Sequence, residues 1–173
     1  GLALALAERI GGTVINADSM QVYRGLEILT AQPSAADRAR VPHLLYGILD
    51  PADPCSAGRW RDLALAAIAE VQGGRRAAIL CGGTGLYLRA LMQGIAPIPA
   101  IPESLRAAVR ARHAELGNAA FHGELAARDP ETAATIRPSD SQRMMRAMEV
   151  LEATGLPLAR WEALPADGPP AGL

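Results

Sequence analysis

A carboxylate stands directly after the first predicted β-strand of this sequence. Residues 13–16 form a short β-rich run that breaks into a polar loop containing Asp18 and Ser19. In open α/β sheets, ligands bind beyond the carboxyl ends of the strands, so a carboxylate here is well placed for a catalytic or metal-binding role. The alternative is that Asp18 or Ser19 only caps the next turn, and the pattern alone leaves both interpretations open.

A glycine-rich turn is the second candidate. Gly82-Gly83-Thr84-Gly85 lies between an apolar run at 77–80 and a helical segment at 86–92. A strand, a glycine-rich turn and a helix present backbone N–H groups to an anion, and the Thr84 hydroxyl adds a donor. A dinucleotide-binding fingerprint would need a third glycine where Leu88 stands. A tight strand-to-helix turn with glycines at positive φ is the alternative.

Two arginines are the third candidate. Arg143 and Arg146 are three positions apart and therefore share a face of a predicted helix. An arginine pair near a helix start can hold a phosphate or stack on a base. A solvated arginine, or one paired with a neighbour such as Glu149, is the more common case. The opposite face of the helix is apolar and carries Met144, Met148 and Leu151.

The elements that position these residues alternate between helix and strand. The expected order is a helix at 2–10, a strand at 13–16, a helix at 59–72, a strand at 77–80 and a helix at 86–92. This order predicts α/β architecture. The apolar run at 44–49 is either a strand or a buried loop, and His43 before it is assigned no role because a lone histidine is usually structural.

A proline-rich segment at 96–102 cannot be helical and marks a boundary. Beyond it, residues 103–116 and 118–128 are predicted helices, and no strand signal accompanies them. This stretch is therefore expected to be a small helical insertion. Ser139 and Gln142 have the spacing of a capping box, which predicts the start of a further helix.

The composition is that of a folded protein without a global charge. The 173 residues suit one domain, or one domain with a small insertion, and half of them are hydrophobic. The net charge of −1 excludes a general attraction to nucleic acid, so any RNA site must be local, and all 17 basic residues are arginine. No apolar run approaches the ~20 residues that span a bilayer. Cys55 and Cys81 lack a paired or metal-ligand spacing, which favours a cytoplasmic protein.

Taken together and in this order, the segments resemble the bacterial tRNA dimethylallyltransferase family. The resemblance spans residues 1 to about 162, and the ordered set is more specific than any single motif. The matching stretches are Asn16–Gly25, Thr30–Pro33, Val41–His43, Ile48–Pro51, Gly82–Leu88, and Gln142-Arg143 with Arg146-Ala147 and Glu149-Val150. A glycine is usual in the family where Leu29 stands, and a lysine where Gln32 stands.

The resemblance implies a P-loop-type, three-layer α/β core with a parallel sheet and a small all-helical insertion. The core would comprise residues 1–95 and 139–173, and residues 103–138 would form an insertion that binds tRNA. In the family a P-loop directly precedes the Leu-Ala-Leu-Ala helix that opens this chain. The first strand, the P-loop and the C-terminal part are therefore expected to be missing, and the fragment as given is expected to be inactive.

The implied reaction transfers a dimethylallyl group from dimethylallyl diphosphate, bound with Mg²⁺, to the exocyclic N6 amine of the adenosine next to the anticodon. Asp18 would act as general base, and Thr84 would lie near the diphosphate and the reacting centre. Ser19, Met20 and Gln21 would line the pocket for the flipped base. The residues expected to contact tRNA, in a monomeric protein, are Arg106, Gln142, Arg143, Met144, Met145 and Arg146.

Other functions fit parts of the pattern. An isopentenyltransferase acting on free adenine nucleotide would keep the fold, but it would need neither the helical insertion nor the arginine-bearing helix. An inactive tRNA-binding fragment would need no phosphate loop. An ordinary P-loop kinase is disfavoured because no segment resembles a phosphoryl-acceptor site.

Overall fold

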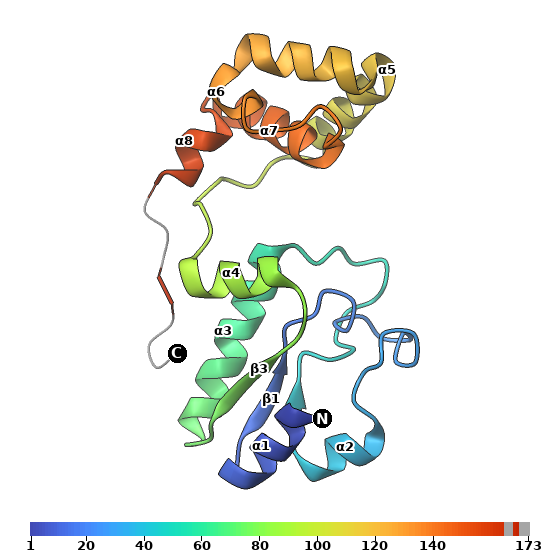
Figure 1. The fold of residues 1–173 in the computed structure, drawn as a ribbon, viewed down its shortest axis with the longest axis vertical. Helices are drawn as coiled ribbons and strands as arrows, with labels where there is room; N and C mark the ends of the chain where they lie inside the picture. The colour runs from blue at the N-terminus through green and yellow to red at the C-terminus, as the bar shows by residue number, and fades with distance from the viewer. Residues whose placement is uncertain (165–167, 170–173) are drawn as a thin grey trace. The chain divides into compact units, whose positions relative to one another are not determined.

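The computed structural model describes residues 1–164 and 168–169 (Figure 1). It divides the chain into two compact units, the first holding residues 1–95 together with the described residues 168–169, and the second holding the described residues from 96 to 164. Among the described residues, no helix combines the length and the apolar character that crossing a membrane requires.

The first unit is an α/β unit and the second is entirely helical. The elements of the first unit are α1 (Leu2–Ile10), β1 (Thr13–Asn16), α2 (Ala35–Arg40), β2 (His43–Leu44), α3 (Ala57–Gly73), β3 (Ala78–Cys81) and α4 (Gly85–Gln93). Those of the second unit are α5 (Glu103–Arg128), α6 (Pro130–Ala133), α7 (Ser141–Thr154) and α8 (Leu158–Glu162).

The sheet is parallel, with the order β2-β1-β3. All four residues of the central strand β1 are buried, because helices cover both faces of the sheet. Successive side chains alternate between the faces: Val14 shares a core with Leu4 of α1, whereas Ile15 packs with Trp60 of α3. Figure 1 shows the strands between α1 and α3, so the expected three-layer α/β fold is confirmed.

The run at 44–49 is mostly a loop, and within it Tyr46 and Leu49 are buried whereas Ile48 is 41% exposed. β2 ends at Leu44, and Leu45 has a φ of 64°, a left-handed conformation that ends an extended strand. The chain then returns to strand-like pairing only at Leu49, which forms a bridge with Tyr23. The backbone of this loop is hydrogen-bonded to the end of β1, because the Leu45 carbonyl accepts a hydrogen bond from Asn16 Nδ2 at 3.1 Å.

The second unit is built around a helical hairpin. Gly117 interrupts α5 with a φ of 71° and a ψ of 171°, which separates it into the two helices predicted at 103–116 and 118–128. A core formed by α5, α6, α7 and α8 includes the fully buried Phe121, Leu125 and Met144.

The helix α7 differs from expectation in two respects. Residues 139–173 were expected to return to the α/β core, but the buried face of α7 packs on α5, and the contacts divide the chain near residue 96. The N-cap is Asp140, whose Oδ1 accepts from Arg143 N at 3.1 Å, so the expected capping box of Ser139 and Gln142 is wrong and a simple cap lies one residue later. Residues 165–167 and 170–173 of the expected core segment lie outside the described residues.

Candidate active site

The candidate site is built at the carboxyl ends of β1 and β3. The two strands run parallel with Asn16 paired to Cys81, so the loops that follow them leave the sheet at the same edge. The loop after β1 carries Asp18, and the turn after β3 carries Thr84. Thr84 N donates to the Ala17 carbonyl at 3.2 Å and joins the two loops directly. The register of the sheet therefore brings together two residues that are far apart in the sequence.

Asp18 is half-buried and has one bonded and one open carboxylate oxygen. Its Oδ1 accepts hydrogen bonds from Met20 N at 2.8 Å and from Gln21 N at 3.3 Å. Among the described residues no group donates to Oδ2, and a Cβ placed on Gly83 would lie 3.6 Å from it. The two interpretations of Asp18 are therefore compatible, because one oxygen caps a turn while the other can meet a ligand.

Thr84 holds the loop that carries Asp18. Its Oγ1 accepts a hydrogen bond from Ser19 N at 2.9 Å and donates to Ser19 Oγ at 3.2 Å. Although Thr84 is the N-cap of α4, its side chain makes no capping hydrogen bond to that helix. The hydroxyl thus stabilises the neighbouring loop and leaves the first N–H groups of α4 without a side-chain cap.

Gly82 is required by a close approach of two backbones. A Cβ at this position would lie 2.6 Å from Asp18 N and closer still to the Ala17 carbonyl. The positive-φ residues of the described chain do not include Gly82, Gly83 or Gly85. The alternative of a turn with glycines at positive φ is therefore wrong, and the missing side chain serves instead to let one loop pack on the other.

Two tyrosines near Asp18 stay protonated at neutral pH. Burial is the main cause that raises the pKa of Tyr46 to about 12, and the charge of Asp18 adds to it. Burial likewise raises the pKa of Tyr87, whose hydroxyl donates to the Cys55 carbonyl at 3.3 Å. Neither phenol can therefore become a phenolate base near pH 7.

Gln21 and Met20 have different surroundings. Gln21 Nε2 donates to the carbonyls of Thr30 at 2.8 Å and Ala31 at 3.3 Å, which fixes the following loop to the Asp18 turn. Met20 is 51% exposed and offers an apolar side chain to a ligand. Of these two expected pocket residues, Met20 has the freer side chain.

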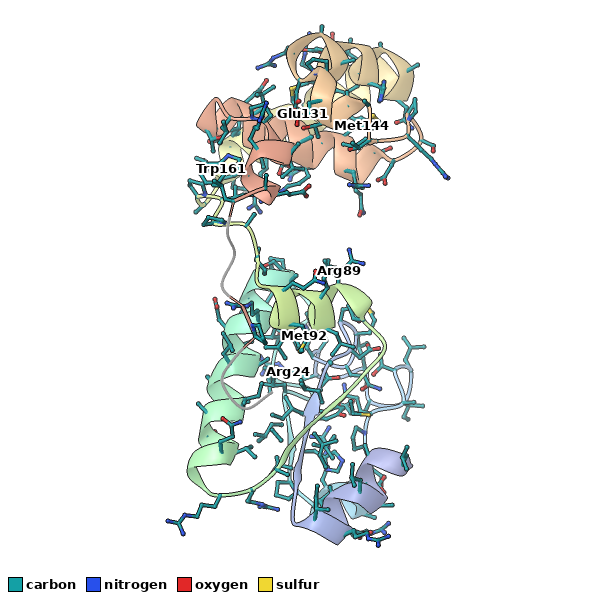
Figure 2. All side chains as sticks on the ribbon, turned by 60° about the vertical axis from the view of Figure 1, so that its left-hand side comes forward. Arg24, Arg89, Met92, Glu131, Met144 and Trp161 are labelled. Atoms are coloured by element: carbon teal, nitrogen blue, oxygen red, sulfur yellow. The ribbon has the colours of Figure 1, made fainter. Side chains whose placement is uncertain are left out.

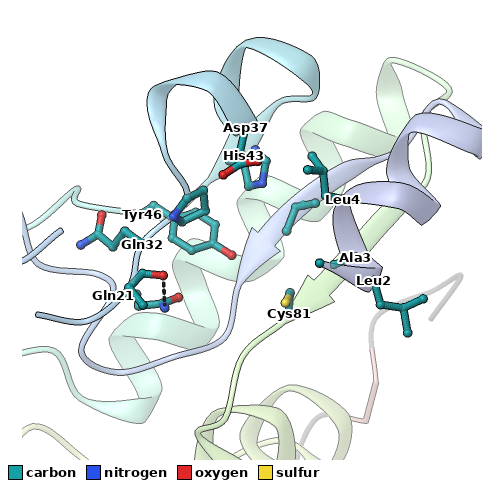
Figure 3. A pocket seen from close by; sticks show the side chains of 13 residues that line it. Leu2, Ala3, Leu4, Gln21, Gln32, Asp37, His43, Tyr46 and Cys81 are labelled. Atoms are coloured by element: carbon teal, nitrogen blue, oxygen red, sulfur yellow. Dashed lines mark hydrogen bonds between the residues drawn. The ribbon is translucent and has the colours of Figure 1, made fainter. Parts of the chain in front are cut away.

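A cavity of about 280 Å³ lies beside these loops. Figure 3 shows His43 and Tyr46 on its wall, so His43 lines a cavity although its sequence context suggested no role. Gln21 of the loop after β1 and Cys81 at the end of β3 also line the cavity, whereas Asp18 does not line it. The cavity is thus a neighbour of the carboxylate and not its immediate surroundings.

The expected arginine pair lies on α7 of the second unit. Gln142 and Arg143 are exposed, and Arg143 takes part in no side-chain hydrogen bond or ion pair with the described residues. Arg146 Nη1 lies 3.6 Å from a carboxylate oxygen of Glu149, the pairing that the sequence left open. Arg143 is therefore the more available of the two cations.

The remaining residues expected to contact tRNA are less accessible. Met144 is fully buried among the helices of its unit (Figure 2), and Met145 is half-buried. Arg106 of α5 is half-buried, and its Nε is buried without a hydrogen-bond partner among the described residues. The structure describes these residues and the Asp18 loop in separate units.

Sequence reasoning missed Asn16. It is 0% exposed, and its side-chain amide hydrogen-bonds to both the N–H and the carbonyl of Asp18. Trp60 of α3 donates from Nε1 to the Asn16 carbonyl at 3.0 Å. The available signal was a polar residue at the end of a buried apolar strand, next to the candidate base.

The described residues offer few ligands of their own for a metal ion. The described residues contain no group of three or more His, Cys, Asp or Glu side chains that could hold a metal ion. Mg²⁺ is often bound by one or two carboxylates together with substrate phosphates.

Comparison with known proteins gives consistent matches. The IPP transferase family profile matches residues 21–170. A tRNA dimethylallyltransferase of Rhodospirillum centenum is 56% identical over 172 residues, covering 99% of this chain and 55% of the relative. One of Parvibaculum lavamentivorans is 55% identical over 165 residues, covering 95% of this chain and 52% of the relative. The chain thus spans about half the length of the curated relatives it matches.

Solved structures also match this chain. The tRNA isopentenylpyrophosphate transferase of Bacillus halodurans superposes with a TM-score of 0.54 at 39% identity, covering 90% of this chain and 52% of that one. A eukaryotic dimethylallyltransferase acting on tRNA superposes with a TM-score of 0.80 at 23% identity, covering 97% of this chain and 42% of that one, and supports the fold alone. By its sequence and its fold, the chain belongs to the IPP transferase family.

Proposed function

We propose that the protein to which this chain belongs transfers a dimethylallyl group from dimethylallyl diphosphate to N6 of the adenosine next to the anticodon of tRNA. The family and the names of the relatives support the reaction class. The arrangement of Asp18 and Thr84 supports a proton-transfer site in this chain, which spans about half the length of its relatives.

The chemistry requires a proton acceptor. The N6 lone pair forms a bond to the allylic carbon while the bond between that carbon and the diphosphate oxygen breaks. The N6 proton leaves to Asp18 Oδ2, and the diphosphate takes the bonding electrons. An exocyclic aromatic amine is a weak nucleophile until its proton has an acceptor, and a positioned base contributes about 10²–10⁴-fold to such a step.

The observation that carries the proposal is the state of the Asp18 carboxylate. Oδ1 is held by two backbone N–H groups, while Oδ2 has no partner among the described residues. A half-buried carboxylate with one oxygen fixed and one open can accept a proton in a defined direction. Thr84 and Ser19 hold the loop from the side of α4, where the uncapped helix start suits an anionic leaving group.

The second unit supports tRNA as the acceptor. Gln142 and Arg143 are exposed next to each other at the first turn of α7. Arginine binds phosphate through a planar fork and stacks on bases, so this turn can contact an RNA loop. A free adenine nucleotide would leave such a surface without a use. Mg²⁺ is proposed to bind together with the diphosphate.

The test is transfer of labelled dimethylallyl to tRNA by the whole protein, a chain of the relatives' length that contains these residues. Asp18→Asn keeps an Oδ1 acceptor for Met20 N and Gln21 N, so the turn is preserved while the base is lost. We expect kcat to fall by about 10²–10⁴-fold with tRNA affinity retained.

The matched control is Asp62→Asn on α3. Asp62 is exposed and makes no side-chain hydrogen bond or ion pair with the described residues, so transfer should be unchanged. Transfer to AMP with none to tRNA would support the free-nucleotide enzyme, and tRNA binding without any transfer would support a binding protein. Full activity of Asp18→Asn would remove Asp18 from the mechanism.

A further inference from the structure

Asn16 is a polar residue in a position that otherwise suits an apolar side chain. It ends the central strand β1, in which every residue is buried, and it is 0% exposed. Burying an amide is unfavourable unless its donor and acceptor are both used. The side chain is fully engaged: Oδ1 accepts from Asp18 N at 2.9 Å, while Nδ2 donates to Asp18 O at 3.0 Å and to Leu45 O at 3.1 Å.

The amide of Asn16 binds Asp18 at both ends of its main chain. Because the N–H and the carbonyl of Asp18 are held by one rigid amide group, the backbone from which the carboxylate projects has a fixed orientation. Oδ1 is then fixed by Met20 N and Gln21 N. The direction of the open oxygen, Oδ2, follows from these two sets of hydrogen bonds.

Asn16 is itself held by the helices behind the sheet. Trp60 Nε1 donates to the Asn16 carbonyl at 3.0 Å, and Trp60 is 0% exposed. The indole stacks on the ring of Tyr87 from α4, with ring centres 4.5 Å apart and an interplanar angle of 13°. The strand end, α3 and α4 thus form one rigid support, and Asn16 connects that support to Asp18.

We propose that Asn16 is a positioning residue that aims the open carboxylate oxygen of Asp18 at the N6 proton of the acceptor. This inference rests on the proposed function. Proton transfer requires the base within about 2.6–3.2 Å of the atom that carries the proton. A displacement of about 1 Å can lower the rate about 10²-fold, so a residue that never contacts substrate can control kcat.

The test separates positioning from packing. Asn16→Leu keeps the number and branching of the heavy side-chain atoms and suits a buried strand, but it removes all three side-chain hydrogen bonds. Asn16→Ser keeps a shorter polar group. In the whole protein we expect Asn16→Leu to lower kcat by about 10–100-fold, with KM for tRNA and for dimethylallyl diphosphate within about twofold of wild type. Asn16→Ser should lie between Asn16→Leu and wild type.

Ile68→Ala is the control for stability. Ile68 is 2% exposed in the same core and its side chain makes no hydrogen bond to Asn16 or Asp18, so the substitution should lower the melting temperature while kcat stays within about twofold. A kcat of Asn16→Leu within twofold of wild type overturns the inference. So does an equal loss of kcat in Ile68→Ala at a matched loss of melting temperature.

A structure of the Asn16→Leu variant tests the inference without relying on the transfer assay. The inference requires the Asp18 carboxylate to be displaced or disordered in that variant, and an unmoved carboxylate contradicts it at any activity. A wild-type protein that transfers nothing contradicts the proposed function instead, so the two failures are distinguishable. If Asn16→Leu does not fold, the kcat and structure of Asn16→Ser decide, with full wild-type kcat counting against the inference.

Discussion

At the scale of single residues, the site depends on hydrogen bonds that leave one group free. Asp18 uses Oδ1 for the backbone of its own turn, and Thr84 uses its hydroxyl for Ser19. The nearby phenols cannot compete with a carboxylate as bases, because burial keeps them protonated. The chemistry assigned to Asp18 therefore follows from which polar atoms its neighbours leave unused.

Tyr46 gives a test of this environment at alkaline pH. Its pKa is raised to about 12 in the folded chain, against about 10 for an exposed tyrosine. The folded state binds the phenolic proton more tightly, so the contribution is complete below pH 10 and is lost as the pH rises towards 12.

We therefore expect the stability of Tyr46→Phe relative to wild type to rise by about 1 kcal/mol between pH 8 and pH 11. Chemical denaturation at the two pH values measures this difference, and pH 8 serves as the internal reference. A constant difference between the two proteins across the range would show that the Tyr46 phenol ionises alike in the folded and unfolded states.

At the scale of elements, the site depends on the contact between the β3–α4 turn and the end of β1. Gly82 makes this contact possible, because any Cβ there would meet the backbone of Ala17 and Asp18 and not a movable side chain. Gly85, three residues later, has open space around it and no positive φ.

We expect Gly82→Ala to destabilise the chain by about 1–3 kcal/mol, because one of the two loops must move to admit the methyl group. Gly85→Ala, the matched control in the same turn, should leave stability unchanged or slightly higher, because alanine favours a helix start over glycine. Denaturant unfolding of both variants measures the effect. Equal stability of the two would show that the backbones do not need the close approach.

The helix α7 has a buried face that packs in the core and an exposed first turn that faces solvent. Met144 and Met148 are buried in the core of the second unit, while Gln142 and Arg143 are exposed on the same helix. A 3.6-residue period makes both possible within one turn. The side chain of Met144 therefore supports the helix, and the proposed RNA contact passes to its exposed neighbours.

At the scale of the whole molecule, the proposed attraction to RNA must be local. The net charge is −1, and many of the arginines are paired with carboxylates, as Arg40 is with Glu8 and Arg112 with Glu124. Such exposed pairs contribute little field at a distance. Arg143 is an exposed arginine without such a partner among the described residues, as Arg9, Arg75 and Arg137 also are, and it is the one of these that lies on α7 beside Gln142.

We expect Arg143→Ala to weaken tRNA binding by the whole protein and to lower the slope of log K against log salt by about one phosphate contact. Arg40→Ala, which removes a paired arginine of α2, is the control and should leave the slope unchanged. Filter binding over a range of salt concentrations measures both. The same slope in Arg143→Ala as in wild type would exclude a phosphate contact at this residue.

The local pattern of the sequence predicted most of the elements of this protein, and together with the family resemblance it singled out Asp18 as the candidate base. Gly11 ends α1 in a left-handed conformation, the run at 13–16 is a strand, and Gly117 separates two helices, because these features depend on residues close in the chain. Asp18 could be singled out for the same reason, since it follows a strand.

Only the tertiary structure decided what Asn16, Gly82 and α7 do. The amide of Asn16 needs the carbonyl of Leu45, and Gly82 needs the backbone of Ala17, so neither role is visible from neighbouring residues. The period of α7 marks its apolar face but not the partner of that face, which proved to be α5. Local propensity is read along the chain, whereas hydrogen bonds and packing between distant segments exist only once the sheet and the hairpin have set their register.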